Sequence, residues 1–352
     1  MNYTISGIQQ IGIGVSDVHE AFKWYRHNFG IDIRVFEEAA TAGLMLPYTD
    51  NQPQERHAIL AFNLQGGGGL EIWQYTGRTP QPPAFEPQLG DYGLFVSKIK
   101  SRNVVVTYQL FQKRKQHLLG NITTNPAGEA YFFMKDPYGN IFQIIGCDTW
   151  FKNEKKLTGG AAGCIIGVSD IEKARMLYSD ILGYDEVVYD KEEKFNDFAV
   201  LPGGRQKARR VLLRHSEARK GVFSRLVGPT EMELVQVKGK KPRKIYENRL
   251  WGDLGYIHLC FDISGMQELK KTCEAKGFPF TVDSSESFDM GEAAGHFSYI
   301  EDPDGTLIEF VETHKVPILK KIGWYLNLKN RDPEKPLPNW MVKAMAFNRV
   351  KD

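Results

Sequence analysis

The sequence predicts an α+β protein made of four strand–helix–strand units in tandem, because two kinds of segment recur along it. The first, a strand end followed by a helix start, reads Gly-Val-Ser-Asp at residues 14–17 and again at residues 167–170. The second is an Asp-Pro-x-Gly turn that leads into an apolar strand, at residues 136–143 and 302–309. Self-similarity over such distances is typical of internal duplication. It predicts two halves of two units each, over residues 6–80, 88–148, 158–240 and 253–315.

Each unit is expected to begin with a strand and a helix. Residues 8–15 are apolar enough for a buried strand, and Ser16 and Asp17 offer side-chain acceptors for a helix start. Apolar side chains from Val18 to Tyr25 then recur at helical spacing. Gly30 follows as the residue expected to end this helix.

The length and the local composition predict how the chain is divided. At 352 residues it exceeds what one ordinary hydrophobic core organises, so two domains are expected, residues 1–150 and residues 158–315. The boundary lies in a polar, lysine-rich segment that ends in two glycines. Residues 316–352 are expected to form a tail, with a short helix over residues 339–349 that docks an apolar stripe on the body.

Charge and composition exclude several classes of function. A net charge of +2 gives no overall attraction to nucleic acid, and no apolar run approaches the roughly 20 residues of a membrane span. The first residues lack the pattern of a signal peptide, and the four cysteines show no CxxC spacing. We therefore expect a cytoplasmic protein with reduced thiols, a monomer or homodimer, that acts on a small-molecule substrate.

Two ionisable residues stand out because they interrupt apolar strands near the end of the repeats. His258 lies in the strand that opens the fourth unit, and Glu309 lies in the strand after the Asp-Pro-Asp-Gly turn. Burying an imidazole or a carboxylate is costly unless the group is paired or bound to a metal. The two residues are therefore candidates for a site, or for a paired core cluster in which Arg249 neutralises Glu309.

Four units with an Asp-Pro-x-Gly turn before a strand that bears Glu resemble the glyoxalase/bleomycin-resistance/dioxygenase superfamily, also called vicinal oxygen chelate. The resemblance covers nearly all of residues 6–315. It implies βαβββ units that pair into two cupped, barrel-like domains, one in each half of the chain. It also implies that metal ligands come from the first and last strands of the paired units.

Transferring those ligand positions to this sequence gives a set of four in each half. The second half then has Gly163, Glu233, His258 and Glu309, and the first half has Gln10, Glu71, Asp91 and Gln143. The resemblance implies that Glu233, His258 and Glu309 hold one divalent ion, which could be Mn, Ni, Co, Fe, Zn or Mg. Glyoxalase I has Gln or His as a fourth ligand, where this half has Gly163. The first half lacks an imidazole, and we interpret it as a polar, metal-free groove.

Three functions remain open from the sequence. The first is a metal-dependent isomerase or lyase in which the ion binds adjacent substrate oxygens and stabilises an enediolate, while Glu309 or Glu233 moves a proton. Two residues that precede Glu309, on the neighbouring strand, are further candidates: Tyr299 has a spacing that resembles that of the active-site tyrosine of extradiol dioxygenases, and His296 could act as an acid or base. The second is an extradiol-type iron dioxygenase, which normally needs two histidines and one carboxylate. The third is a metal-free protein that binds a small apolar ligand, as bleomycin-resistance relatives do.

Overall fold

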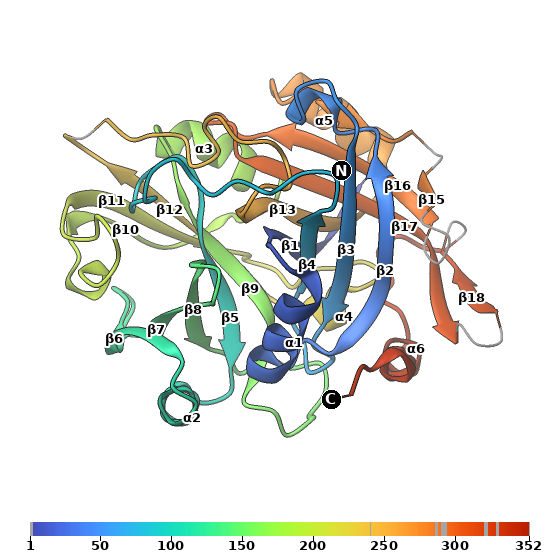
Figure 1. Cartoon of the computed structure of the whole chain (residues 1–352), viewed down its shortest axis with the longest axis horizontal. Coiled ribbons are helices and arrows are strands. Elements are labelled where there is room, and N and C mark those ends of the chain that lie inside the picture. The colour runs from blue at the N-terminus through green and yellow to red at the C-terminus, as the bar shows by residue number, and fades with distance from the viewer. Residues whose placement is uncertain are drawn as a thin grey trace.

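A computed structural model describes residues 3–239, 241–285, 288–289, 294–319, 323–328 and 331–351 of the chain. Parts of the predicted tail, residues 320–322, 329–330 and 352, lie outside the described residues. The predicted fold class is confirmed: strand–helix–strand units follow one another along the chain, and their strands form two curved sheets (Figure 1). None of the helices in the described ranges combines the length and the apolar character needed to cross a membrane.

The first two units cover the first half of the chain. The first contains β1 (Thr4–Gly14), α1 (Val18–Phe29), β2 (Ile33–Ala42), η1 (Leu46–Tyr48), β3 (Gln54–Phe62) and β4 (Gly69–Tyr75). The second contains β5 (Gly93–Ser101), α2 (Val104–Lys113), β6 (His117–Thr124), β7 (Ala130–Lys135) and β8 (Ile141–Gly146).

The other two units and the tail follow. The third unit contains β9 (Thr158–Gly167), α3 (Ile171–Tyr178), β10 (Glu186–Lys194), η2 (Asn196–Phe198), β11 (Lys207–Arg214), α4 (Ser224–Val227) and β12 (Glu231–Val237). The fourth contains β13 (Gly255–Ser264), α5 (Met266–Ala275), β14 (Val282–Asp283), β15 (Phe288–Asp289), β16 (Ala294–Glu301) and β17 (Leu307–Leu319). The tail adds β18 (Trp324–Asn327), α6 (Asn339–Ala344) and η4 (Met345–Asn348).

The helix starts form where the sequence predicts them. Asp17 caps α1, its carboxylate accepting hydrogen bonds from the backbone amides of His19 and Glu20, and Asp170 caps α3 in the same way. Gly30 ends α1 in the left-handed conformation, with φ of 65°, which costs glycine little.

The pairing of the units differs from the predicted arrangement, in which each half of the chain forms its own barrel. Among the described strands, ten form one sheet, in which β1 of the first unit pairs antiparallel with β13 of the fourth. The other eight form the second sheet, in which β5 of the second unit pairs antiparallel with β9 of the third. The first strand of each unit is apolar, and its free edge must pair with another strand. Because such a strand occurs in all four units, the repeat alone does not specify which first strands pair with each other.

Helices, rather than strands, join the two units within each half. Tyr25 of α1 donates a hydrogen bond of 2.6 Å to Asp136, in the Asp-Pro-x-Gly turn of the second unit. Tyr178 of α3 donates one of 2.9 Å to Asp302, in the corresponding turn of the fourth unit. Helix-to-turn contacts therefore link the two units of each half, while the sheets cross from one half to the other.

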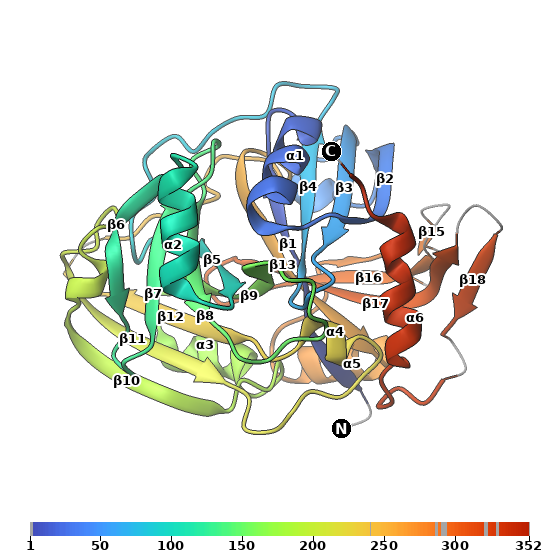
Figure 2. The ribbon, with the colours of Figure 1, turned by 90° about the horizontal axis from the view of Figure 1, so that it is seen from below.

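The tail packs on the sheet formed by the first and fourth units. In Figure 2, α6 lies alongside this sheet, and η4 packs against β2 and β17. Val342 and Met345 are buried, whereas Trp340 and Phe347 remain exposed. The docked face of the tail therefore includes Met345.

Candidate metal centre

Four polar side chains, from four strands, converge on the concave side of the ten-stranded sheet. They are Gln10 of β1, Glu71 of β4, His258 of β13 and Glu309 of β17. The strand register brings them together, because Gly12 pairs with both Glu71 and His258, and Cys260 pairs with Glu309. Gly12 leaves the space for the imidazole, since a Cβ atom there would lie 2.5 Å from Cε1 of His258.

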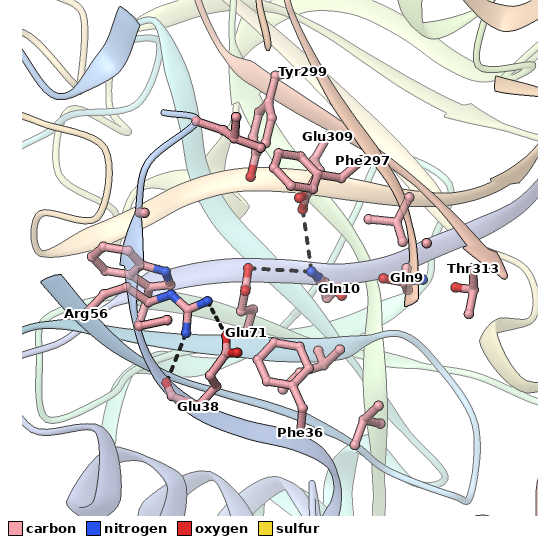
Figure 3. A pocket seen from close by; sticks show the side chains of 18 of the residues that line it. Gln9, Gln10, Phe36, Glu38, Arg56, Glu71, Phe297, Tyr299, Glu309 and Thr313 are labelled. Carbon is pink, nitrogen blue, oxygen red and sulfur yellow. Dashed lines mark hydrogen bonds and ion pairs between the residues drawn. The ribbon is translucent and has the colours of Figure 1, made fainter. Parts of the chain in front are cut away.

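The polar atoms of these side chains point toward a common centre. Nε2 of His258 lies 3.2 Å from Oε2 of Glu71 and 3.1 Å from Oε2 of Glu309. Nε2 of Gln10 lies 3.5 Å from the same two oxygens, and Figure 3 shows this amide between the two carboxylates. His258 is fully buried, and Glu309 and Gln10 are nearly so.

The charges of the centre are unbalanced without a cation. Burial on its own would lower the pKa of His258, but the carboxylates of Glu309 and Glu71 outweigh it and raise the pKa to about 10. An imidazolium thus takes the place between two carboxylates that a divalent ion would otherwise fill.

Two buried atoms show that the residues suit a metal ion. Nε2 of His258 lies 3.1 and 3.2 Å from the two carboxylates but makes no well-aligned hydrogen bond, and Oε1 of Gln10 is buried without a partner in the described part of the chain. A cation between the carboxylates would satisfy Nε2 directly. It would also satisfy Oε1 after a half-turn of the amide, whose oxygen and nitrogen are interchangeable in shape. Two carboxylates, one imidazole and one amide oxygen form a donor set suited to a divalent first-row ion or Mg²⁺.

Glu233, predicted as a ligand of the same ion, lies in the other sheet. It is fully buried on β12, where it accepts hydrogen bonds from Lys98 Nζ at 2.7 Å, from the hydroxyl of Tyr189 at 2.6 Å and from Arg210. Burial alone would raise its pKa, but the Arg210 and Lys98 cations lower the pKa to about 2. The predicted convergence of Glu233 with His258 and Glu309 is therefore wrong, because β12 belongs to the eight-stranded sheet. Glu71 of the first unit occupies that position instead.

The remaining positions of the transferred sets, Gly163, Gln143 and Asp91, also lie away from the centre. Gly163 lies on β9, where a Cβ atom would lie 1.9 Å from the carbonyl oxygen of Glu231. Gln143 is buried on β8 of the same sheet, away from Gln10 and Glu71. Asp91 accepts hydrogen bonds from the backbone amides of Gln88 and Arg243, at 2.8 and 3.0 Å. The polar groove predicted for the first half does not form as one site.

The two further candidate residues, Tyr299 and His296, are placed differently from each other. Tyr299 is buried beside the centre, with its hydroxyl 3.4 Å from Nδ1 of His258, and burial together with the nearby carboxylates raises its pKa well above the ordinary value. A partner at Nδ1 orients the ring so that Nε2 faces the carboxylates. The structure does not bring His296 to the centre, because its Nε2 lies 2.6 Å from Asp283. Arg249, considered as a partner of Glu309, donates instead to the carbonyls of Ile245 and Leu254.

A cavity of about 340 Å³ opens beside the centre. Gln10, Glu71, Glu309 and Tyr299 line one side of it, and Figure 3 shows these side chains facing Phe36 and Arg56. The other walls are mainly apolar and include Leu60, Phe62, Trp73, Phe223, Trp251 and Phe297. Met345 of η4 also lines the cavity, so the tail completes its wall. A pocket of this size and lining suits a small, largely apolar molecule whose polar end reaches the centre.

The chain is similar to known proteins in family and in fold. The model of the Glyoxalase/Bleomycin resistance protein/Dioxygenase superfamily matches residues 7–144 and 161–310. None of the curated protein sequences matches the chain.

Two solved structures illustrate the similarity of fold. Glyoxalase I from Zea mays superposes with a TM-score of 0.52 at 13% identity, covering 87% of this chain and 92% of that chain. A provisionally assigned dioxygenase from Bacillus subtilis has a TM-score of 0.59 at 13% identity, covering 88% of this chain and 86% of that chain. At such identities the likeness concerns the fold alone, whereas the family model spans most of the sequence. The chain belongs to the glyoxalase/bleomycin-resistance/dioxygenase superfamily.

Proposed function

We propose that this protein is a divalent-metal-dependent, glyoxalase-like enzyme that carries out isomerase or lyase chemistry on a small oxygenated substrate. The observation that supports this most directly is the convergence of Gln10, Glu71, His258 and Glu309 beside a cavity. These residues are of the types expected for glyoxalase I ligands, with Gln10 at the position of the Gln or His ligand.

The four residues would hold one ion, and each supporting contact has a role. When bound, a divalent ion supplies electrophilic polarisation of adjacent substrate oxygens. Tyr299 holds the imidazole of His258 in place through Nδ1. Glu309 and Glu71 present carboxylate oxygens to the cavity, so each can move a proton between neighbouring carbons of a substrate bound there. The apolar walls exclude water from that proton and bind the body of the substrate.

The residue types of the centre do not favour the dioxygenase alternative. Ring-cleaving iron enzymes normally use two histidines and one carboxylate. Here one histidine stands with two carboxylates, and Gln10 occupies the position that a second histidine would need. Oxygen uptake with catechols would reveal such an activity if it existed.

The test is metal analysis of the purified protein and of two histidine variants. We expect His258→Ala to lose close to one ion per chain, together with any isomerase or lyase activity. His296→Ala is the matched control, because His296 is also buried but lies with Asp283 outside the centre. The His296→Ala variant should keep the ion of the candidate centre even if its melting temperature falls. Equal metal content in the unaltered chain and in His258→Ala would contradict the proposal, and the absence of metal from both would favour the metal-free binding protein.

A further inference from the structure

We propose that the protein has a second, outer site for a divalent ion such as Zn²⁺, Co²⁺ or Ni²⁺. It is formed by His19, Glu37 and His57. Among the described residues, these three form the other cluster of potential ligand atoms that lie within 4.8 Å of one another. Glu37 Oε1 lies 3.7 Å from Nδ1 of His19 and 3.3 Å from Nε2 of His57. The proposal does not depend on the inner centre, because the two sites share no residue.

The three ligands come from three elements whose positions are fixed by the fold. His19 lies in the first turn of α1, and its backbone amide is held by the capping carboxylate of Asp17 at 3.0 Å. Glu37 of β2 and His57 of β3 lie on neighbouring strands, offset by two positions in the register, since Glu37 pairs with Ile59 and Ala39 with His57. Long side chains at such diagonal positions reach each other. An ion here would connect the helix to the hairpin.

The site lies on the outer face of the same strands that form the cavity. Phe36 and Glu38, the neighbours of Glu37, line the cavity, as does Arg56, the neighbour of His57. Because successive side chains of a strand point to opposite faces, Glu37 and His57 point away from the cavity. The ion would therefore stabilise the wall of the cavity from outside and would not contact a substrate within it.

The chemistry of the cluster favours one ion with an exchangeable ligand. Two imidazoles and one carboxylate are donors preferred by Zn²⁺, Co²⁺ and Ni²⁺. Arg34 forms an ion pair with Oε2 of Glu37, which turns Oε1 toward both imidazoles. The rings of His19 and His57 meet edge to face, with centroids 5.0 Å apart, so their nitrogens can converge without the rings stacking. The side chain of His19 is 63% exposed, which leaves the remaining coordination position open to water.

The test is Zn²⁺ and Co²⁺ titration of the full chain and of surface variants. His57→Ala should bind one fewer Zn²⁺ per chain than the unaltered protein and should lose the visible Co²⁺ absorption of an imidazole-rich site. It should also lose the rise in melting temperature that Zn²⁺ causes through this site. His27→Ala is the matched control, because His27 is exposed on the same helix but outside the cluster, and it should bind as the unaltered protein does.

A second variant distinguishes the outer site from the proposed inner centre. In His258→Ala, the outer site should still bind one Zn²⁺, and adding His57→Ala should abolish that binding. Identical Zn²⁺ stoichiometry in the unaltered chain, His57→Ala and Glu37→Gln would overturn the outer site. The proposed function would stand in that case, because its test depends on the ion lost from His258→Ala.

Discussion

Glu71 and Glu233 occupy equivalent strand positions in the first and third units, but their surroundings give them different chemistry. Glu71 faces His258 and Gln10, whose polar atoms suit a metal ion. Glu233 faces Lys98 and Arg210, whose positive charges lie where a cation would otherwise bind. The same residue type is thus a candidate ligand in one sheet and a buried ion-pair partner in the other.

Exchanging each of these carboxylates for an amide separates the two roles. Glu71→Gln should lose most of the bound metal, because a neutral amide binds a dication more weakly than a carboxylate does. Glu233→Gln should keep the metal but lower the free energy of unfolding by about 2 kcal/mol, because Lys98 and Arg210 each lose one of two carboxylate partners. Metal analysis and chemical denaturation measure both effects. Loss of metal from Glu233→Gln but not from Glu71→Gln would instead support the ligand set transferred from the sequence.

Asp262 predicts a pH dependence of stability. One of its oxygens accepts a hydrogen bond of 3.4 Å from Gln9, the other is buried without a partner among the described residues, and burial raises the pKa of Asp262 to about 7. An unfolded Asp has a pKa of about 3.9, so the unfolded state ionises first as the pH rises. This residue's contribution to the free energy of unfolding should therefore be complete below pH ~4 and lost as the pH rises to about 7, by at most roughly 4 kcal/mol.

Replacing Asp262 with Asn tests this dependence, because an amide does not ionise. Asp262→Asn should have nearly the stability of the unaltered protein at pH 4 and should be more stable at pH 8. Denaturation curves at the two pH values measure the difference. An equal stability change at both would show that Asp262 ionises alike in the folded and unfolded states.

At the scale of elements, one arginine ties the end of the tail to the first unit and to the segment between the two halves. Arg349 pairs with both carboxylate oxygens of Glu154, at 2.6 and 2.7 Å, and also with Asp32. The backbone amide of Val350 donates to the carbonyl of Asp32 at 2.9 Å. These contacts keep Met345 in the wall of the cavity.

Arg349→Ala should release the tail and open the cavity. We expect a loss of about 2 kcal/mol in the free energy of unfolding, because hydrogen bonds between charged groups contribute about that much. Residues 339–351 should also become sensitive to proteases, and KM for a substrate should rise more than kcat changes. Lys343→Ala is the control, since Lys343 is exposed on α6 and should tolerate the change. Equal protease resistance of the two variants would show that other contacts hold the tail.

At the scale of the whole molecule, the candidate centre is divided between the two halves of the chain. Gln10 and Glu71 come from the first half, and His258 and Glu309 come from the second. The sheets cross between the halves, because β1 pairs with β13 and β5 pairs with β9. Neither half contains a complete sheet.

Separate expression of residues 1–150 and 151–352 tests this arrangement. Neither fragment alone should bind metal at the candidate centre or unfold cooperatively, because each would expose the apolar first strands of its units. Mixing the fragments during refolding should restore the ion of that centre, one per pair of fragments. Binding of that ion by residues 151–352 alone would indicate instead that each half forms its own barrel.

Much of the fold could be predicted from the sequence because the signals are local. Asp17 and Asp170 cap helices, Gly30 ends one, and the Asp-Pro-x-Gly segments form turns, each through contacts within a few residues. His258 and Glu309 could be selected as site residues for a similar reason, because a charged group in an apolar strand needs a partner wherever that strand pairs.

Only the tertiary structure decided which units pair, and with that choice it decided the site. Backbone hydrogen bonds between strands do not depend on side-chain identity, and the first strands β1, β5, β9 and β13 are all largely buried. Their partners follow from how all four units pack together, which no single segment encodes. The sequence by itself therefore determined the four units and the types of residue available for a site. The crossing of the sheets decided that Glu71 and Gln10, rather than Glu233 and Gly163, lie beside His258 and Glu309.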